Sequence, residues 1–210
     1  MKTTIYDERY KSKISYWNFR PSGMAFKILE LFPPTGQRPK VLEIGCGEGG
    51  TAIFLAKNDY DVTAFDLSSI GVAKTMENAN KHNVEVKAFK ADVNDFVPEE
   101  KYDVIFSSGT LQYLIPEKRG HFISLLKEYT NTNGLNVLHT FVSKPFIDIA
   151  PDAEKSESLW SSGELLLLYK DWMTEHFFEE IKTCNSSGIS HRHAHNRIWS
   201  RKPQSTQPRS

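Results

Sequence analysis

The sequence predicts an α/β fold, in which a mostly parallel sheet carries helices on both faces and ends in an antiparallel hairpin. Strand-like and helix-like runs alternate along most of the chain, which is typical of a parallel sheet built from βαβ units. A glycine-rich turn directly follows the first apolar strand, as in the first half of a doubly wound sheet. Near the end of the chain, two strand-like runs follow each other without a helix, so we expect them to pair antiparallel.

The composition is that of one globular domain. Of the 210 residues, 39% are hydrophobic and 25% are charged, and the 26 acidic residues balance the 26 basic ones. This balance gives no sign of nucleic-acid or membrane binding. Two cysteines, Cys46 and Cys184, make no disulfide framework. We therefore expect a protein of the reducing cytoplasm. We also expect a monomer or homodimer.

The chain before the first strand, residues 1–39, is expected to form a helical segment. Apolar residues at helical spacing predict a helix over 24–32, which a Pro-Pro pair ends. Aromatic residues come earlier, with Tyr16 and Trp17 close to Arg20. They either pack this segment against the sheet or cover a bound ligand as a lid, with Arg20 pairing with a carboxylate of the ligand. Both alternatives stay open.

The rest of the chain divides into strands and helices by its hydrophobic pattern. A helix near 163–172 precedes the terminal pair of strands, which turn residues at 184–190 separate. The polar residues 203–210 are expected to form a disordered tail, so that one domain covers 1–202. The expected strands are 40–44, 61–66, 84–91, 102–107, 134–142, 174–183 and 191–201, and the other expected helices lie near 49–58, 69–81 and 117–130.

The turn after the first strand has the character of a nucleotide-binding corner. Residues 40–49 read Lys-Val-Leu-Glu-Ile-Gly-Cys-Gly-Glu-Gly, so small residues lie between an apolar strand and a helix. Glycine tolerates positive φ and lets a ligand approach the backbone closely. Gly45, Gly47 and Gly50 also match the G-x-G-x-x-G dinucleotide fingerprint, which is a weak signal by itself. An NAD-dependent oxidoreductase is therefore one alternative.

Acidic residues stand at three successive strand ends. Glu43 lies two residues before Gly45, where a carboxylate suits a cationic ligand better than a pyrophosphate. Asp66 ends the second strand and can accept hydrogen bonds from both hydroxyls of a ribose. Asp92 ends the third strand and can accept from an adenine amino group, while the N–H of Val93 meets the ring. Each aspartate alone could be a cap or a loop acid, but the combination favours S-adenosylmethionine, which has a cationic methionine end, over NAD.

These motifs together resemble the class I S-adenosylmethionine-dependent methyltransferases. The resemblance rests on the turn at 43–49, on Asp66 and Asp92, and on the strand at 102–107. It implies a Rossmann-like three-layer sandwich with a seven-stranded, mostly parallel sheet. It also implies the strand order 3-2-1-4-5-7-6 and S-adenosyl-L-methionine as the cofactor.

Two further stretches are similar to the tellurite-resistance (TehB-like) methyltransferases. These are residues 52–66 and 162–172, together with the ending Ser-Arg-Lys at 200–202. The resemblance implies methyl transfer to a small-molecule acceptor, either an oxyanion such as tellurite or selenite, or a thiol. The chain departs from the better-studied members in the loop 144–158 and in its His-rich final strand. A protein that binds S-adenosylmethionine without catalysis is the remaining alternative.

Contacts to the cofactor are expected from the lid, from the turn and from the strand ends. Cys46 is expected to pack beside the cofactor and not to react as a thiol. Ser107 follows the fourth strand, where a small residue leaves room for the acceptor or caps a helix. The expected cofactor-binding residues are Tyr16, Trp17, Arg20, Glu43, Gly45, Cys46, Gly47, Asp66, Leu67, Asp92, Val93 and Ser107.

The final strand carries a cluster of histidines. His191, His193 and His195 alternate along the strand and share one face, while Arg192 points to the other. They could bind Zn²⁺, form an exposed polar face, or bind the acceptor. We expect no metal, because no cysteine or carboxylate of similar spacing lies beside them.

We take His191, Arg192 and His193 as the catalytic candidates. A histidine with a pKa near neutrality can accept a proton from a thiol. An arginine or a protonated histidine can instead hold an oxyanion. We assign no role to the remaining histidines, which are His82, His121, His139 and His176.

Overall fold

The sheet has seven strands in the order β3-β2-β1-β4-β5-β7-β6, which confirms the expected order. The computed structural model describes residues 4–11, 15–16, 19–151, 153–154, 157–185 and 188–204. The strands are β1 (Lys40–Ile44), β2 (Asp61–Asp66), β3 (Val86–Lys90), β4 (Tyr102–Ser108), β5 (Thr130–Val142), β6 (Met173–Cys184) and β7 (His191–Arg201). The helices are α1 (Ile5–Tyr10), α2 (Gly23–Leu31), α3 (Gly50–Lys57), α4 (Ser69–Lys81), α5 (Arg119–Glu128) and α6 (Glu164–Leu168), with 3₁₀ turns η1 (Leu111–Tyr113) and η2 (Pro116–Lys118).

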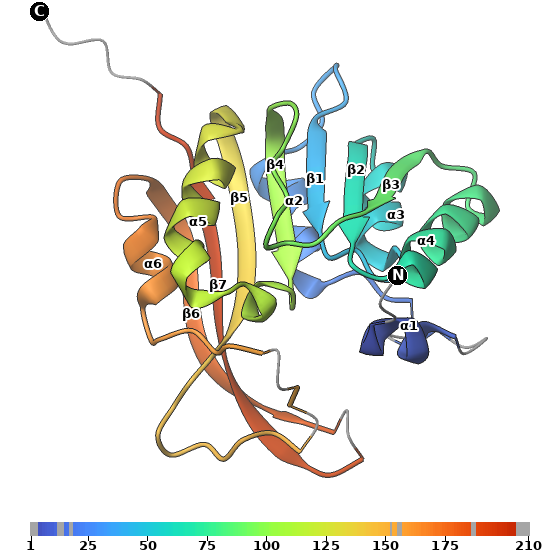
Figure 1. Ribbon diagram of the computed structural model, residues 1–210. Helices are drawn as coiled ribbons and strands as arrows, with labels where there is room; N and C mark the ends of the chain where they lie inside the picture. The colour runs from blue at the N-terminus through green and yellow to red at the C-terminus, as the bar shows by residue number, and fades with distance from the viewer. Residues whose placement is uncertain are drawn as a thin grey trace, which may run out of the picture.

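Neighbouring residues of the central strands point into two separate apolar layers, as the pleat of a strand requires. In β1, Val41 is buried in one cluster with α2 and α3. The next residue, Leu42, is buried in a second cluster with α5 and α6. Continuous apolar strands between two helical layers are typical of parallel sheets. The expected three-layer sandwich is therefore confirmed (Figure 1).

The parallel part of the sheet collects several strand ends at one edge. Strands β1 to β5 pair in parallel, and Ile44 at the end of β1 lies beside Phe65 of β2 and Ser107 of β4. Ligands of open α/β sheets bind outside this carboxyl edge, where the strand order reverses. The reversal falls at β1, from which the chain continues to β2 on one side and later returns to β4 on the other.

Strand β7 runs antiparallel to both of its neighbours and extends beyond the end of one of them, β5. Its pairing with β5 stops where Val142 meets Ala194, whereas its pairing with β6 continues to Cys184 and His191. The end of the β6–β7 hairpin therefore projects beyond β5, and Figure 1 shows it continuing below the carboxyl ends of β1 and β4. The expected terminal hairpin is confirmed.

Some element boundaries differ from those expected. Strand β3 is shorter than 84–91, and β5 begins at Thr130 and not at 134. Irregular pairing between β4 and β5 accommodates the turn-like residues that follow Thr130. Helix α6 ends at Leu168, because the N–H groups of Tyr169 and Trp172 bond to carbonyls three residues back and turn the chain tightly. Among the residues that the structure describes, no helix has both the length and the apolar character needed to cross a bilayer.

Candidate active site

The glycine turn after β1 has backbone conformations that glycine favours. Gly45, Gly47 and Gly49 have φ values of 77°, 55° and 88°, in the left-handed region that side chains rarely occupy. A Cβ atom at Gly45 would lie 1.8 Å from the Oγ1 atom of Thr110. The N–H groups of Gly45 and Cys46 both donate to the carbonyl of Phe65, at 2.8 and 3.0 Å. The turn is thus tied to the end of β2, and no side chain has room at Gly45.

Asp66 at the end of β2 holds this turn through its carboxylate. Its Oδ2 atom accepts from the N–H of Gly47 at 2.8 Å, and its Oδ1 atom accepts from the N–H of Ser68 at 2.8 Å. Burial raises the pKa of Asp66 above its ordinary value, although these two hydrogen bonds act in the opposite direction. Each carboxylate oxygen can accept a second hydrogen bond, so the side chain can hold the turn and a ligand hydroxyl together.

Glu43 is buried in β1, behind the glycine turn. Its carboxylate accepts a hydrogen bond from the N–H of Ala52 in the first turn of α3. Its Oε2 atom is buried and has no hydrogen-bond partner among the described residues. Burial and the nearby charge of Asp66 raise the pKa of Glu43 well above its ordinary value. A buried carboxyl group of this kind favours its neutral form unless a cation approaches.

Glu48, which the sequence reasoning passed over, ties the N-terminal segment to the turn. Its Oε2 atom accepts from the Ser15 hydroxyl and from the N–H of Tyr16, both at 2.7 Å, and its Oε1 atom pairs with the Lys74 ammonium at 2.9 Å. Burial raises the pKa of Glu48, but the hydrogen bonds outweigh it and bring that pKa below its ordinary value. The position of Glu48 inside the glycine motif is the sequence feature that could have indicated this role.

The predicted lid residues lie close to the turn as far as the structure describes them. Tyr16 is partly exposed, and the guanidinium of Arg9 lies 5.5 Å from its ring centre. The carbonyl of Arg20 lies 2.8 Å from the position of a Cβ atom at Gly50, while its side chain is exposed. Trp17 lies outside the described residues. The backbone of this segment therefore crosses the turn.

The predicted adenine-side residues lie at the ends of β2 and β3. The Oδ1 atom of Asp92 accepts from the backbone N–H of Asn94 at 2.9 Å and from its side chain at 3.1 Å, which makes a local turn. Val93 is buried and packs in the core layer that contains α5. Leu67 follows Asp66 and is 41% exposed.

Two predicted residues are enclosed by the protein itself. Ser107 is fully buried, and its hydroxyl donates to the carbonyl of Ile44 at 3.2 Å. It therefore joins the ends of β1 and β4, and it does not cap a helix. Cys46 is buried beside Thr75, and burial raises the pKa of its thiol well above the ordinary value. This is the environment of an inert packing residue.

A cluster that sequence reasoning missed joins α1 to the loop after β5. The hydroxyls of Tyr6 and Tyr113 lie 2.7 Å apart, and the Tyr113 hydroxyl donates to Glu157 at 3.1 Å. Arg9 pairs with Glu154 at 2.8 Å. Burial raises the pKa of Tyr6 to about 12 and raises the pKa of Tyr113 further. Both hydroxyls therefore stay protonated and bond the N-terminal helix over η1.

The histidines form a line that starts at the carboxyl edge. His139 of β5 pairs in register with Ser108 of β4, and its Nε2 atom lies 2.8 Å from Nδ1 of His195 on β7. Burial lowers the pKa of His139 to about 3 and that of His195 to about 4, so both imidazoles are neutral. The ring of Phe141 packs against His195 and His193, at 4.9 and 4.8 Å between ring centres. His139 received no role from the sequence, because its cross-strand partner depends on the register.

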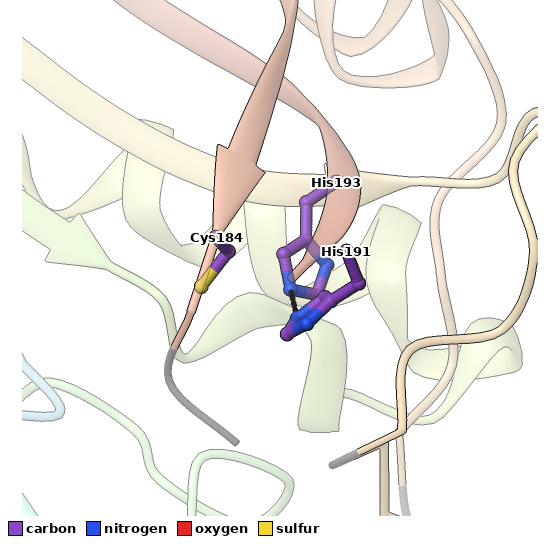
Figure 2. Close-up of side chains that lie close together, drawn as sticks. All are labelled: Cys184, His191 and His193. Atoms are coloured by element: carbon purple, nitrogen blue, oxygen red, sulfur yellow. Dashed lines mark hydrogen bonds between the residues drawn. The ribbon is translucent and has the colours of Figure 1, made fainter. Parts of the chain in front are cut away.

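The three catalytic candidates divide between the faces of β7. The Nε2 atoms of His191 and His193 lie 2.8 Å apart. The guanidinium of Arg192 donates to the carbonyl of Phe146 at 3.3 Å and is exposed. The expectation that no cysteine lies beside the histidines is wrong, because Cys184 of β6 is the register partner of His191 and its sulfur joins the cluster (Figure 2).

Comparison with known proteins identifies the family. The family model described as tellurite resistance protein TehB matches residues 29–198. The chain belongs to the TehB family. This confirms the resemblance seen in the glycine motif and in the strand ends.

A curated sequence and a crystal structure, both of TehB from Haemophilus influenzae, define how far this likeness extends. TehB from Haemophilus influenzae, named as a probable S-adenosyl-L-methionine-dependent methyltransferase, is 32% identical over 133 residues, which are 63% of this chain and 46% of that protein. The crystal structure of TehB from Haemophilus influenzae gives a TM-score of 0.77 at 24% identity and covers 94% of this chain and 65% of that one. This chain thus spans less than half the length of the curated relative.

A more distant neighbour shares the fold alone. The structure of a phosphoethanolamine N-methyltransferase from Haemonchus contortus, in complex with phosphomonomethylethanolamine and S-adenosylhomocysteine, gives a TM-score of 0.68 at 16% identity. The match covers 97% of this chain and 61% of that one. At this level of identity the likeness shows a shared fold and nothing more about this chain.

Proposed function

We propose that this TehB-family chain binds S-adenosyl-L-methionine at the carboxyl edge of the sheet and transfers its methyl group to a small-molecule acceptor. The observation that carries the proposal is the turn from Gly45 to Gly49, whose left-handed backbone is held by the Asp66 carboxylate. The names of the relatives point to the same donor. We expect the protein to act in the cytoplasm, as a monomer or homodimer, without nucleic-acid partners.

The proposed cofactor contacts follow the strand ends. Asp66 would accept the ribose hydroxyls, and Asp92 with the N–H of Val93 would meet the adenine. We propose that the methionine portion lies beside the glycine turn, and the unpaired Oε2 atom of Glu43 lies behind that turn. We propose the same set of contact residues that the sequence predicts, which is Tyr16, Trp17, Arg20, Glu43, Gly45, Cys46, Gly47, Asp66, Leu67, Asp92, Val93 and Ser107.

Methyl transfer requires mainly that the acceptor is aligned with the methyl donor. The sulfonium of S-adenosylmethionine supplies an activated methyl group, so the protein has to hold the acceptor in line and exclude water. Alignment of this kind can contribute up to about 7–11 kcal/mol in ideal intramolecular cases. The N-terminal helix contacts η1 through the Tyr6–Tyr113 pair and the loop after β5 through the Arg9–Glu154 ion pair. Both contacts suit the exclusion of water.

On the acceptor side we propose His191, Arg192 and His193. A thiol acceptor needs a group that takes its proton, and a neutral imidazole can do this. An oxyanion such as tellurite or selenite carries its own charge and needs cationic groups that hold it. The hairpin offers both kinds of group, so both acceptor classes belong in the test.

Calorimetric titration with S-adenosylmethionine and S-adenosylhomocysteine tests the donor. We expect binding of both by the parent protein, and no binding by Gly47→Val, because a β-branched side chain at φ 55° is strained and covers the turn. The far-UV spectrum of the variant should keep its α/β form. Binding of NADH in place of these ligands would support an oxidoreductase and contradict the proposal.

A turnover screen tests the acceptor. The parent protein is incubated with labelled S-adenosylmethionine and with tellurite, selenite, simple thiols or amines, and volatile products are detected by mass. We expect methylated product from an oxyanion or a thiol. Donor binding without product from any acceptor would instead indicate a binding protein without catalysis.

A further inference from the structure

The end of the β6–β7 hairpin brings three metal-ligating side chains together. Cys184 and His191 are register partners across the hairpin, and His193 lies two residues along β7 on the same face. One ligand atom from each of the three lies within 4.8 Å of the others. Figure 2 shows both imidazoles and the Cys184 side chain gathered at the end of the hairpin.

The two ring nitrogens lie closer together than in a tetrahedral metal site, and the sulfur lies within 4.8 Å of them. Zinc–nitrogen bonds of about 2.0–2.1 Å and a zinc–sulfur bond of about 2.3 Å at tetrahedral angles place nitrogens about 3.3 Å apart and sulfur about 3.5 Å from nitrogen. The Nε2 atoms of His191 and His193 lie 2.8 Å apart. Small rotations of the two rings would therefore separate these nitrogens enough to admit an ion between them.

A second contact determines which ring nitrogen of His191 carries the proton. Its Nδ1 atom lies 2.7 Å from the carbonyl oxygen of Ile189. A carbonyl only accepts, so Nδ1 carries the proton, and the Nε2 lone pair of His191 accepts from Nε2–H of His193. A metal ion would replace that hydrogen bond, and His193 would then carry its proton on Nδ1. Metal-binding histidines commonly have their other ring nitrogen bonded to a carbonyl in this way.

The surrounding charges are compatible with a cation. On the same face, Lys182 is the register partner of His193, and its ammonium pairs with Glu180 at 3.1 Å. The same carboxylate pairs with Arg197 at 2.8 Å. A coordinated thiolate would cancel one charge of a divalent ion, so the occupied site would have a net charge near +1. Lys182 would repel such a site less than it would repel a bare divalent ion.

We propose that Cys184, His191 and His193 bind a divalent transition-metal ion such as Zn²⁺, with a fourth position open to water or to an anion. One thiolate and two imidazoles suit Zn²⁺ and related ions and do not suit Mg²⁺ or Ca²⁺, which prefer oxygen. Three protein ligands with an open position are typical of sites that bind a further molecule, and fully closed sites are typical of structural zinc.

The consequence for the acceptor rests on the proposed function. If methyl transfer takes place as proposed, a bound metal would occupy the ring nitrogens of His191 and His193. These residues would then hold an anionic oxyanion or thiolate through the open coordination position and would not accept its proton. Metal binding itself does not depend on this step and can be measured without turnover.

The test is a titration of the untagged, reduced, chelator-treated full chain with Co²⁺, followed by displacement with Zn²⁺. We expect one Co²⁺ per chain, with ligand-field bands of a tetrahedral site and a thiolate-to-cobalt charge-transfer band that Zn²⁺ abolishes. Cys184→Ser should remove the charge-transfer band. His193→Gln should weaken Co²⁺ binding by more than about tenfold, since a ligand should matter at least as much as its supporting partners.

Matched variants separate a built site from general surface binding. His195→Gln changes the next histidine on the same face of β7, and His121→Gln changes an exposed histidine of α5; both should keep the Co²⁺ affinity within about twofold. Absence of the charge-transfer band, or an equal loss in His195→Gln and His193→Gln, would overturn the proposal. Calorimetry with S-adenosylhomocysteine on the same variants should show unchanged affinity, so a failure of donor binding is distinguishable from a failure of metal binding.

Discussion

At the scale of single residues, Asp66 is the side chain on which the proposed donor site depends most. It holds Gly47 and Ser68 through separate oxygens and lies at the end of β2. Replacing it by alanine should weaken binding of S-adenosylhomocysteine by about 1–3 kcal/mol, the usual loss for hydrogen bonds to a charged group. Calorimetry measures this loss. Asp61→Ala, at the opposite end of the same strand, is the control, and equal affinities of both variants would remove Asp66 from the site.

Glu43 makes a prediction about pH. Burial raises its pKa well above the ordinary value, so the folded protein binds this proton more tightly than the unfolded chain does. Stability is then greatest below the unfolded pKa, which is about 4.3 for glutamate, and falls as the pH rises toward the folded value.

Glu43→Gln has no ionisable group at this position. Its free energy of unfolding should therefore fall less than that of the parent protein as the pH rises. Chemical denaturation of both ligand-free proteins between about pH 4.5 and about pH 8 measures the difference. The amide can still accept the hydrogen bond from Ala52. Parallel pH curves for the two proteins would contradict the assigned environment.

A substitution of His191 tests the proposed acceptor site, again at the scale of a single residue. His191→Gln should lower kcat for the acceptor found in the screen by more than about tenfold, as is usual for loss of an acid–base group, or to a similar extent if the residue holds a metal. The affinity for S-adenosylhomocysteine should stay unchanged. An equal loss in turnover and in donor affinity would place His191 in the donor site or in the fold.

At the scale of elements, the N-terminal helix is expected to act as a cover that opens. Its side chains reach η1 and the loop after β5 through the Tyr6–Tyr113 contact and the Arg9–Glu154 pair. Tyr113→Phe removes one hydroxyl and should speed amide hydrogen exchange in α1, because local opening costs less free energy when such contacts are lost.

Exchange measured by mass spectrometry on the ligand-free protein checks this effect. Tyr129→Phe changes a tyrosine at the far end of α5 and is the control. We also expect S-adenosylhomocysteine to slow exchange in α1. Identical exchange in the parent protein and in Tyr113→Phe would show that the tyrosine contact does not hold the helix.

The hydrophobic pattern was sufficient to predict the elements that form the core. Runs such as Val41 to Ile44 are buried on both faces, so their length and composition identify them directly. The start of β5 was missed because residues 131–134 read Asn-Thr-Asn-Gly, which is turn chemistry, although the structure includes them in the strand. The apolar pattern overestimates the length of α6, because Tyr169 is buried and Trp172 packs against the same core layer without either being helical.

At the scale of the whole molecule, the candidate site divides into a part that sequence can predict and a part that it cannot. The turn and Asp66 follow one another within a short stretch, so local spacing places them together. The association of Cys184 with His191, and of His139 with His195, depends on the register of paired strands. The turn geometry of the hairpin and the packing of β5 set that register, and neither is visible in the spacing of the residues.

The contact of Glu48 with the N-terminal segment has the same origin. Ser15 and Lys74 are distant in sequence from Glu48, yet both bond its carboxylate. Such contacts connect the N-terminal segment to the glycine turn and to α4. The spacing of the motif residues alone therefore could not predict them.

A crystal structure of the full chain with S-adenosylhomocysteine tests the central claim most directly. We predict the ligand over the Gly45–Gly49 turn, with its ribose hydroxyls on Asp66 and its adenine beside Asp92 and Val93. The N-terminal segment should lie across it. A saturated crystal that shows the ligand elsewhere on the protein, or shows side chains filling this position and no ligand, would contradict the account.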